Sequence, residues 1–196
     1  MMYRRIAIVQ GHPDRSARHF CHALAEEYVR GAEDAGHDIQ LIDVARLEFP
    51  FLRSQRAWED QALPSSLKVA QTTLAWAEHW LVVFPLWMGD MPAILKAFFE
   101  QVLRPGFAFG AGAPGPFSEK LLKGKSARIV VTMGMPAVVY RWYFRAHSLK
   151  SLERNILGFC GVAPIDETLI GTVEEEGRAT HEKWLSQLRK LGRDAR

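Results

Sequence analysis

The chain has 196 residues, of which 48% are hydrophobic and 24% charged, the composition of an ordinary globular protein with a sizeable core. Its net charge of +3 and its pI near 9.0 are modest, and the basic residues near the C-terminus are interleaved with glutamates. This pattern is typical of a solvated helix face and argues against a nucleic-acid partner.

Targeting and metal-binding signals are missing from the sequence. The first residues run straight into a strand pattern, so we expect no signal peptide and a cytoplasmic location. No stretch approaches the roughly 18 apolar residues that a membrane helix requires. The cysteines, Cys21 and Cys160, lack metal-type pairing and are expected to be buried and reduced. The length predicts one domain over residues 1–196, without a metal site.

Residues 3–9 predict the first strand, which leads through a loop at 10–18 into a helix ending near Ala35. A loop that feeds a helix N-terminus favours an anion there, and the Ser16 hydroxyl could donate to it. Arg15 or Arg18 could add charge. In the alternative, which the sequence leaves open, Ser16 is an ordinary helix cap and His12 a loop residue.

Residues 38–44 predict the second strand, and a long connection follows at 45–65. Its aromatic residues, among them Phe49 and Trp58, are expected to pack over the sheet edge or against a second subunit. A helix is predicted from Ser65 or Ser66 to Glu78.

The third strand, at residues 80–84, is apolar without alternation, as is typical of a parallel strand covered on both faces. The loop at 85–91 leaves its carboxyl end, where open α/β sheets bind ligands. Its aromatic, sulfur-containing and glycine residues could lie against a planar heterocycle. Alternatively, Trp87 and Met88 merely cap the core. Pro92 suits the first turn of a helix that reaches Leu103.

The second half of the chain continues the alternation of strands and helices. A glycine- and proline-rich loop at 110–116, near Phe107 and Phe109, would form a wall or lid over a flat substrate. Alternatively, it is a surface loop that happens to lie near aromatic residues. The fourth strand is predicted at 127–132 and is followed by a loop at 132–136. A helix at 149–159, a fifth strand within 162–171 and a last helix at 174–191 complete the chain.

The fold class follows from this order of elements. Five repeats of strand and helix predict a three-layer α/β fold with a five-stranded parallel sheet of order 2-1-3-4-5. The loops after the first, third and fourth strands then meet at the point where the strand order reverses.

Several stretches together resemble one protein family: residues 11–16, 84–96, 104–109, 115–117, 122–127, 131–134 and 159–161. With these, the chain resembles the flavodoxin-like NAD(P)H:quinone oxidoreductases. That family includes the DT-diaphorases, bacterial NAD(P)H-dependent oxidoreductases and ancillary proteins of potassium-efflux systems. The resemblance covers nearly the whole chain.

The resemblance implies roles for individual residues. Those expected to bind the flavin are His12, Ser16, Pro85, Leu86, Trp87, Met88, Thr132 and Gly134. The resemblance places Phe109 beside the substrate, with Phe107 near it, and makes Tyr140 and His147 the catalytic candidates. The chain departs from the family at three places: His19 replaces an Asn, Met88 replaces a Trp, and residues 133–136 replace a Gly pair.

The function implied is a flavin-dependent NAD(P)H oxidoreductase that reduces quinones or similar flat electrophiles by ping-pong hydride transfer. FMN is the expected cofactor, with FAD as the alternative, and the family implies a homodimer with active sites at the subunit boundary. One competing hypothesis is a flavin-bearing regulatory subunit of a membrane ion-efflux system. Another is an electron-carrier flavodoxin, which the net charge of +3 disfavours.

Overall fold

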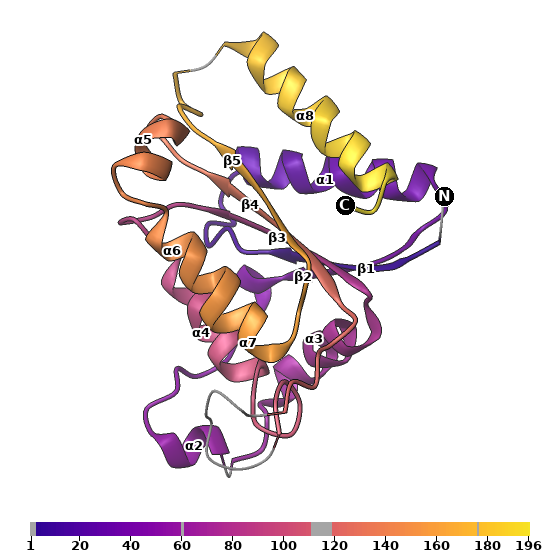
Figure 1. Cartoon of the computed structure of the whole chain (residues 1–196), viewed down its shortest axis with the longest axis vertical. Coiled ribbons are helices and arrows are strands. Elements are labelled where there is room, and N and C mark those ends of the chain that lie inside the picture. The colour runs from indigo at the N-terminus through magenta and orange to yellow at the C-terminus, as the bar shows by residue number, and fades with distance from the viewer. Residues whose placement is uncertain (1–2, 60, 111–118, 176) are drawn as a thin grey trace.

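The computed structural model describes residues 3–59, 61–110, 119–175 and 177–196. It is built on a five-stranded parallel sheet in the order β2-β1-β3-β4-β5 (Figure 1). The strands are β1 (Arg5–Gln10), β2 (Asp38–Asp43), β3 (His79–Pro85), β4 (Ser126–Thr132) and β5 (Ile165–Ile170). The predicted fold class and strand order are confirmed. The glycine-rich loop predicted as a lid lies largely outside the described residues.

The central strand β3 is buried along its whole length. It pairs with β1 on one side and β4 on the other, so both of its edges are hydrogen-bonded. This explains its continuous apolar run, because side chains on both faces meet a helical layer.

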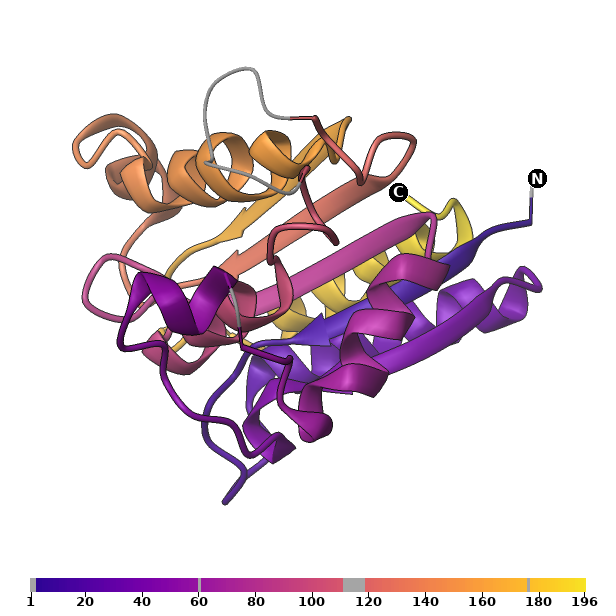
Figure 2. The same ribbon diagram turned by 90° about the horizontal axis from the view of Figure 1, so that it is seen from below.

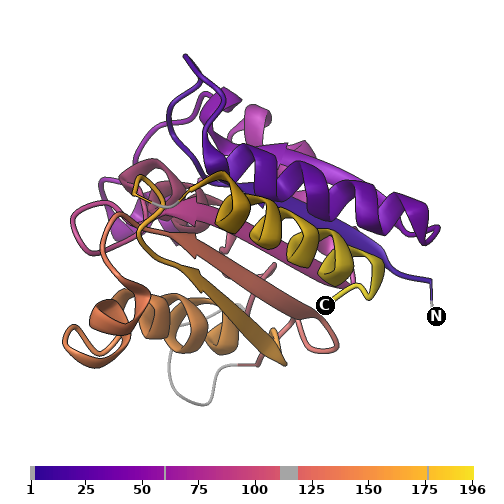
Figure 3. The same cartoon turned by 90° about the horizontal axis from the view of Figure 1, so that it is seen from above.

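Two helical layers cover the sheet. On one face lie α1 (Phe20–Asp34) and α8 (Arg178–Arg193), side by side in Figure 3. The other face carries α3 (Ser65–Trp76), α4 (Ala93–Val102) and a continuous run of α6 (His147–Lys150), η2 (Ser151–Leu157) and α7 (Gly158–Cys160), seen from below in Figure 2. No helix among the described residues is long and apolar enough to cross a membrane.

Helices α1 and α8 approach closely through two glycines. A Cβ atom on Gly31 would lie 1.8 Å from the carbonyl oxygen of Arg189, and one on Gly192 would lie 2.0 Å from that of Tyr28. Arg189 also pairs with Asp34 at 2.8 Å. The backbones therefore touch where any side chain would separate them.

The long connection after β2 contains η1 (Val44–Arg46) and α2 (Gln55–Glu59). Phe49 packs on Phe98 of α4, with ring centroids 6.4 Å apart. Arg104 donates to the carbonyls of Ala57 (3.3 Å) and Gln61 (2.5 Å). The described part of this segment therefore packs on α4 and on the turn that follows it.

Helix α1 begins at Phe20, directly after the predicted loop, with His19 as its N-cap, so Ser16 is not a helix cap. One helix start differs from the prediction. Helix α8 begins at Arg178 rather than at Glu174, because residues 172–175 form a turn closed by a hydrogen bond from the Glu175 N–H to the Thr172 carbonyl (3.0 Å). An additional short helix, α5 (Ala137–Trp142), follows β4.

We expect Gly31→Ala to lower the free energy of unfolding by at least about 2 kcal/mol, because the methyl group would overlap a backbone carbonyl. Urea denaturation measures this. The control is Gly177→Ala, where a Cβ meets nothing within 4 Å, and where the change should stay below about 1 kcal/mol because only the preference of the α8 N-cap for Gly is lost. Equal stability of the two variants would contradict the close packing of α1 on α8.

Candidate functional site

A cleft of about 610 Å³ lies at the carboxyl ends of β1, β3 and β4. Three loops form most of it, one between β1 and α1, one between β3 and α4, and one between β4 and α5, and the start of α1 and the segment after β5 complete it. Its lining residues are His12, Asp14, His19, Phe20, Cys21, Pro85, Leu86, Trp87, Thr132, Met133, Gly134, Val173 and Glu174. The predicted meeting of three strand ends thus forms one cleft.

The first loop is held by Gln10, the last residue of β1. Its side chain accepts from the His12 N–H (3.0 Å) and donates to the Cys21 carbonyl (3.1 Å), which ties the loop to the first turn of α1. Gly11 lies so close to α4 that a Cβ atom would be 2.6 Å from a methyl carbon of Leu95. The backbone path of this loop is therefore fixed from both sides.

Asp14 organises the middle of that loop. Its Oδ1 accepts from the Ser16 hydroxyl (2.6 Å) and backbone N–H (2.7 Å), and its Oδ2 lies 2.7 Å from Nε2 of His19. These contacts, the Ser16 hydroxyl first, hold the pKa of Asp14 below its usual range. The site therefore contains a carboxylate at neutral pH.

Three histidines gather beside Asp14. The rings of His12 and His19 are stacked, with centroids 3.9 Å apart and planes 14° apart, and His22 lies 5.2 Å from His12. Burial lowers the pKa of His12 to about 4, assisted by its two histidine neighbours. Because His12 Nδ1 accepts from the Asp14 N–H (3.2 Å), the proton of neutral His12 lies on Nε2.

The second loop is a tight turn on the end of β3. Trp87 and Asp90 exchange two backbone hydrogen bonds of 2.8 and 3.0 Å, and φ is +50° at Met88 and +81° at Gly89. Two central residues with positive φ are the mark of a type I′ turn. Trp87 is half-exposed, with its ring edge-on to His12 at 6.0 Å, whereas the Met88 side chain is fully exposed.

The third loop contacts the first turn of α1 and the segment after β5. The Thr132 hydroxyl lies 3.1 Å from the Cys21 thiol, whose pKa burial raises to about 12. Gly171 lets the two segments touch, since a Cβ atom there would lie 2.6 Å from the Met135 carbonyl oxygen. At Gly134 the space is open, since a Cβ atom would meet nothing within 4 Å.

Most of the residues expected to bind the flavin line this cleft: His12, Pro85, Leu86, Trp87, Thr132 and Gly134. Two others do not. Ser16 is exposed and bonded to Asp14, and Met88 stands at the tip of its turn.

The residues expected to act on the substrate lie apart from the cleft within one chain. Tyr140 is buried, with its hydroxyl 2.6 Å from that of Ser148 and accepting from the Leu149 N–H (3.1 Å), so it anchors α6. His147 is exposed at the start of α6. Phe109 is buried between Trp58 and Phe159 beside a separate cavity of about 460 Å³, and Phe107 is half-buried.

Sequence reasoning missed Asp14, Cys21, Val173 and Glu174 as parts of the site, and noted His19 only as a departure from the family. The spacing of Asp14 and Ser16 was an available signal, because Asp side chains commonly accept from the backbone two residues on. No comparable local pattern in the sequence marks the other missed residues, because only the folding of the chain brings them to the cleft.

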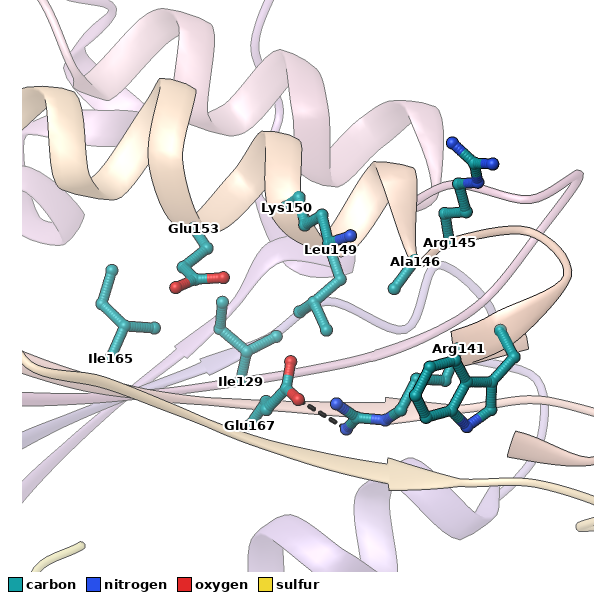
Figure 4. A pocket seen from close by; sticks show the side chains of 10 residues that line it. Ile129, Arg141, Arg145, Ala146, Leu149, Lys150, Glu153, Ile165 and Glu167 are labelled. Carbon is teal, nitrogen blue, oxygen red and sulfur yellow. Dashed lines mark ion pairs between the residues drawn. The ribbon is translucent and has the colours of Figure 1, made fainter. Parts of the chain in front are cut away.

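A groove of about 700 Å³ lies under α6 at the β5 edge (Figure 4). Arg141 and Glu167 form an ion pair of 2.5 Å in it, and Ile129, Leu149 and Ile165 supply apolar side chains. It shares no lining residue with the cleft.

The comparison with protein families identifies the family to which the chain is related. The family model for the flavodoxin-like fold matches residues 4–191. The chain belongs to this family. Its position in the flavodoxin-like family accounts for the site, because the doubly wound sheet brings the ends of β1, β3 and β4 together.

Individual relatives support the resemblance to quinone oxidoreductases. The mouse ribosyldihydronicotinamide dehydrogenase [quinone] is 32% identical over 152 residues, which is 73% of this chain but less than two-thirds (64%) of the mouse protein. An uncharacterized NAD(P)H oxidoreductase of Escherichia coli is 27% identical and is matched over 99% of this chain and 97% of its own.

Among solved structures, an NAD(P)H:quinone oxidoreductase from Methanothermobacter marburgensis has the same fold. Its TM-score is 0.81 at 23% identity, over 98% of this chain and 97% of that one.

The buried histidines predict a loss of stability in acid. Folded His12 stays neutral down to about pH 4, whereas the unfolded imidazole takes up a proton as the pH falls through about 6.5. The free energy of unfolding is therefore highest above pH 6.5 and falls towards pH 4. His12 accounts for roughly 1–2 kcal/mol of this loss at pH 4.5. In urea unfolding of the ligand-free protein, His12→Gln should lose stability less steeply between pH 7.5 and 4.5. Identical pH dependence in both proteins would contradict the assignment.

Proposed function

We propose that the protein is a flavin-dependent NAD(P)H oxidoreductase that reduces quinones or similar flat electrophiles. The observation that carries this proposal is the cleft itself, in which an apolar wall of Pro85, Leu86 and Trp87 faces the first turn of α1. A flat ring and a phosphate are the two ends of a flavin mononucleotide, and the cleft offers a surface suited to each. The oxidoreductase names of the relatives support the same activity.

The first loop fits the phosphate end. Helix α1 has 15 residues, and its first N–H groups have no acceptor within the helix, so its N-terminus favours an anion. His12 supplies a neutral Nε2–H donor beside it, held by the bond between the Asp14 N–H and Nδ1. Ser16, whose hydroxyl now donates to Asp14, is the second proposed donor.

The second and third loops fit the ring end. Trp87 presents a half-exposed face, and Pro85 and Leu86 complete a flat apolar wall. Thr132, the strand neighbour of Pro85, and Gly134 lie beside this wall, where the backbone could approach the polar edge of a ring. A flavin held there would supply the chemistry for hydride transfer from NAD(P)H to the acceptor. The protein's part is to hold the ring with one face open, so that donor and acceptor take turns on it.

Tyr140 and His147 remain our catalytic candidates. The Tyr140 hydroxyl is engaged by Ser148 and by the Leu149 N–H, so it fixes the start of α6, the helix that carries His147. From that position His147 could stabilise negative charge on a bound substrate.

We also propose a homodimer with a shared pocket. Neither Phe107 nor Phe109 lines the cleft of its own chain, and Phe109 is buried, so only the half-buried Phe107 could approach an active site in a second copy. Trp142 is 76% exposed, and Tyr143 and Phe144 are exposed beside it. Such contiguous apolar surface is typical of an interface.

The competing functions have less support. An electron carrier would be expected to carry an acidic docking face, whereas the net charge is +3. The relatives described above are named as oxidoreductases, and none of them is named as a transporter subunit. A cytoplasmic location remains part of the proposal.

The cofactor is tested directly. Purified protein should bind FMN and show a visible flavin absorbance band, which NAD(P)H should bleach and a quinone restore. Mass analysis of the released cofactor distinguishes FMN from FAD. Repeated reconstitution without a flavin band would refute the proposed function.

The shared pocket is tested by Trp142→Ala. Loss of a large exposed ring should weaken self-association in light scattering and lower quinone turnover together, because both depend on the same contact. The control is Val69→Ala on α3, another exposed apolar side chain, which should change neither. A wild-type monomer with full NAD(P)H–quinone activity would contradict the dimer.

A further inference from the structure

A group of polar side chains is buried near the amino ends of the strands, between the sheet and the helices α1 and α8. His79 of β3 and Arg128 of β4 stand two residues before Leu81 and Val130, which pack against these helices, and side chains two apart on a strand share a face. Tyr28 of α1 belongs to the same core. Tyr28, His79 and Arg128 are only 0%, 2% and 7% exposed. The cleft lies at the opposite ends of the strands.

Each of these three side chains has a buried polar atom without a hydrogen-bond partner in the described part of the chain. The atoms are the Tyr28 hydroxyl oxygen, Nε2 of His79 and Nε of Arg128. A buried polar group that lacks a partner loses its hydration without compensation, so such groups are rare in folded proteins. Three of them in one core indicate a bound group that satisfies them.

The three side chains lie close enough together to share one bound group. Burial raises the pKa of Tyr28, and the charges of Arg128 and Arg4 oppose this rise. Burial, together with the charges of the same two arginines, lowers the pKa of His79 to about 3. Both guanidinium groups therefore act on both side chains, and Tyr28 and His79 are uncharged at neutral pH.

The hydrogen bonds around His79 show that its unpartnered nitrogen is a donor. The Ser126 hydroxyl oxygen lies 2.8 Å from Nδ1 of His79 and accepts from Nη1 of Arg4 (3.3 Å). Because a guanidinium only donates, the Ser126 hydroxyl proton goes to His79 Nδ1, and the proton of the neutral ring lies on Nε2. Nε of Arg128 is also a donor, and the Tyr28 hydroxyl can donate. The bound group must therefore accept three hydrogen bonds.

The charges in this region favour an anion. Arg128 is paired with Asp166 at 2.9 Å. Arg4 donates to two neutral groups, the Ser126 hydroxyl and the Ala195 carbonyl (3.4 Å). Of the two guanidinium charges, only that of Arg128 is thus paired with a carboxylate in the described part of the chain. A single negative charge between the donors would balance the other.

We propose that the protein binds a small monovalent anion, chloride under ordinary conditions, between Tyr28, His79 and Arg128. A halide ion is spherical and accepts from three donors at once. A water molecule would bring no charge, and its own protons would need acceptors that these three donors do not supply. The ion would tie α1 to β3 and β4, because one donor comes from each element. This site is independent of the proposed function.

Urea unfolding at constant ionic strength tests the site in solution, with sodium gluconate replaced stepwise by sodium chloride. A ligand that binds only the folded state raises the folding equilibrium constant by up to about tenfold for each tenfold rise in its concentration above its Kd. We expect this dependence in the wild-type protein. Arg128→Met should abolish it, because this change removes a charge and a donor, while Asp166 is half-exposed and stays hydrated.

A gentler variant and its control isolate one donor. Tyr28→Phe keeps the ring and removes only the hydroxyl, so a higher chloride concentration should be needed for half of the effect. The matched control is Tyr3→Phe, which removes an exposed hydroxyl that donates to Asp38 and should keep the wild-type chloride dependence. If Arg128→Met does not fold, an unchanged dependence in Tyr28→Phe overturns the proposal.

Crystals of the wild-type protein grown in sodium bromide identify the bound group. Because bromide scatters anomalously, we expect an anomalous difference peak within hydrogen-bonding distance of the Tyr28 hydroxyl, His79 Nε2 and Arg128 Nε. A missing peak overturns the proposal, including the case in which a water molecule bridges the three atoms. A chloride dependence that persists in folded Arg128→Met overturns it as well.

Discussion

The site depends on the pairing of β3 with β1 and β4. All seven residues of β3 are buried, and both of its edges are hydrogen-bonded in parallel. The ladders continue into the loops, through bonds from the Gly11 N–H to the Val83 carbonyl (2.8 Å) and from the Leu86 N–H to the Thr132 carbonyl (2.7 Å). The starting points of all three loops are therefore set by the core, and a rigid sheet edge positions the side chains that line the cleft.

Packing far from the cleft also contributes to it. Helix α1 carries the first loop of the cleft at its N-terminus, and Gly31 near its other end touches the backbone of α8. Inside the cleft, burial keeps His12 neutral while hydrogen bonds keep Asp14 ionised. A neutral histidine, a carboxylate and the N-terminus of a helix thus lie within one short loop.

The sequence predicted the architecture well and the side-chain positions less well. Apolar runs such as residues 80–84 identify buried parallel strands, and their order places the three loops, which is why the fold and the family were predicted correctly. The sequence left the cap of α1 open, because the hydrogen bond between Asp14 and Ser16 depends on the loop conformation, and the structure has His19 as the cap. Residues 172–175 form a turn, which removes Glu174 from the last helix. The stacking of His12 on His19 and the outward direction of Met88 depend on backbone geometry that spacing does not reveal.

The turn at Met88 and Gly89 has a consequence for the evolution of the site. Its shape is set by the Trp87–Asp90 backbone pair, and the side chain at position 88 projects fully into solvent. Residues that tolerate positive φ, such as Asn or Asp, can replace Met88 without disturbing the core. The rim beside the proposed ring site can therefore change while the scaffold stays constant, so substitutions at position 88 alter the surface of the cleft at little cost in stability.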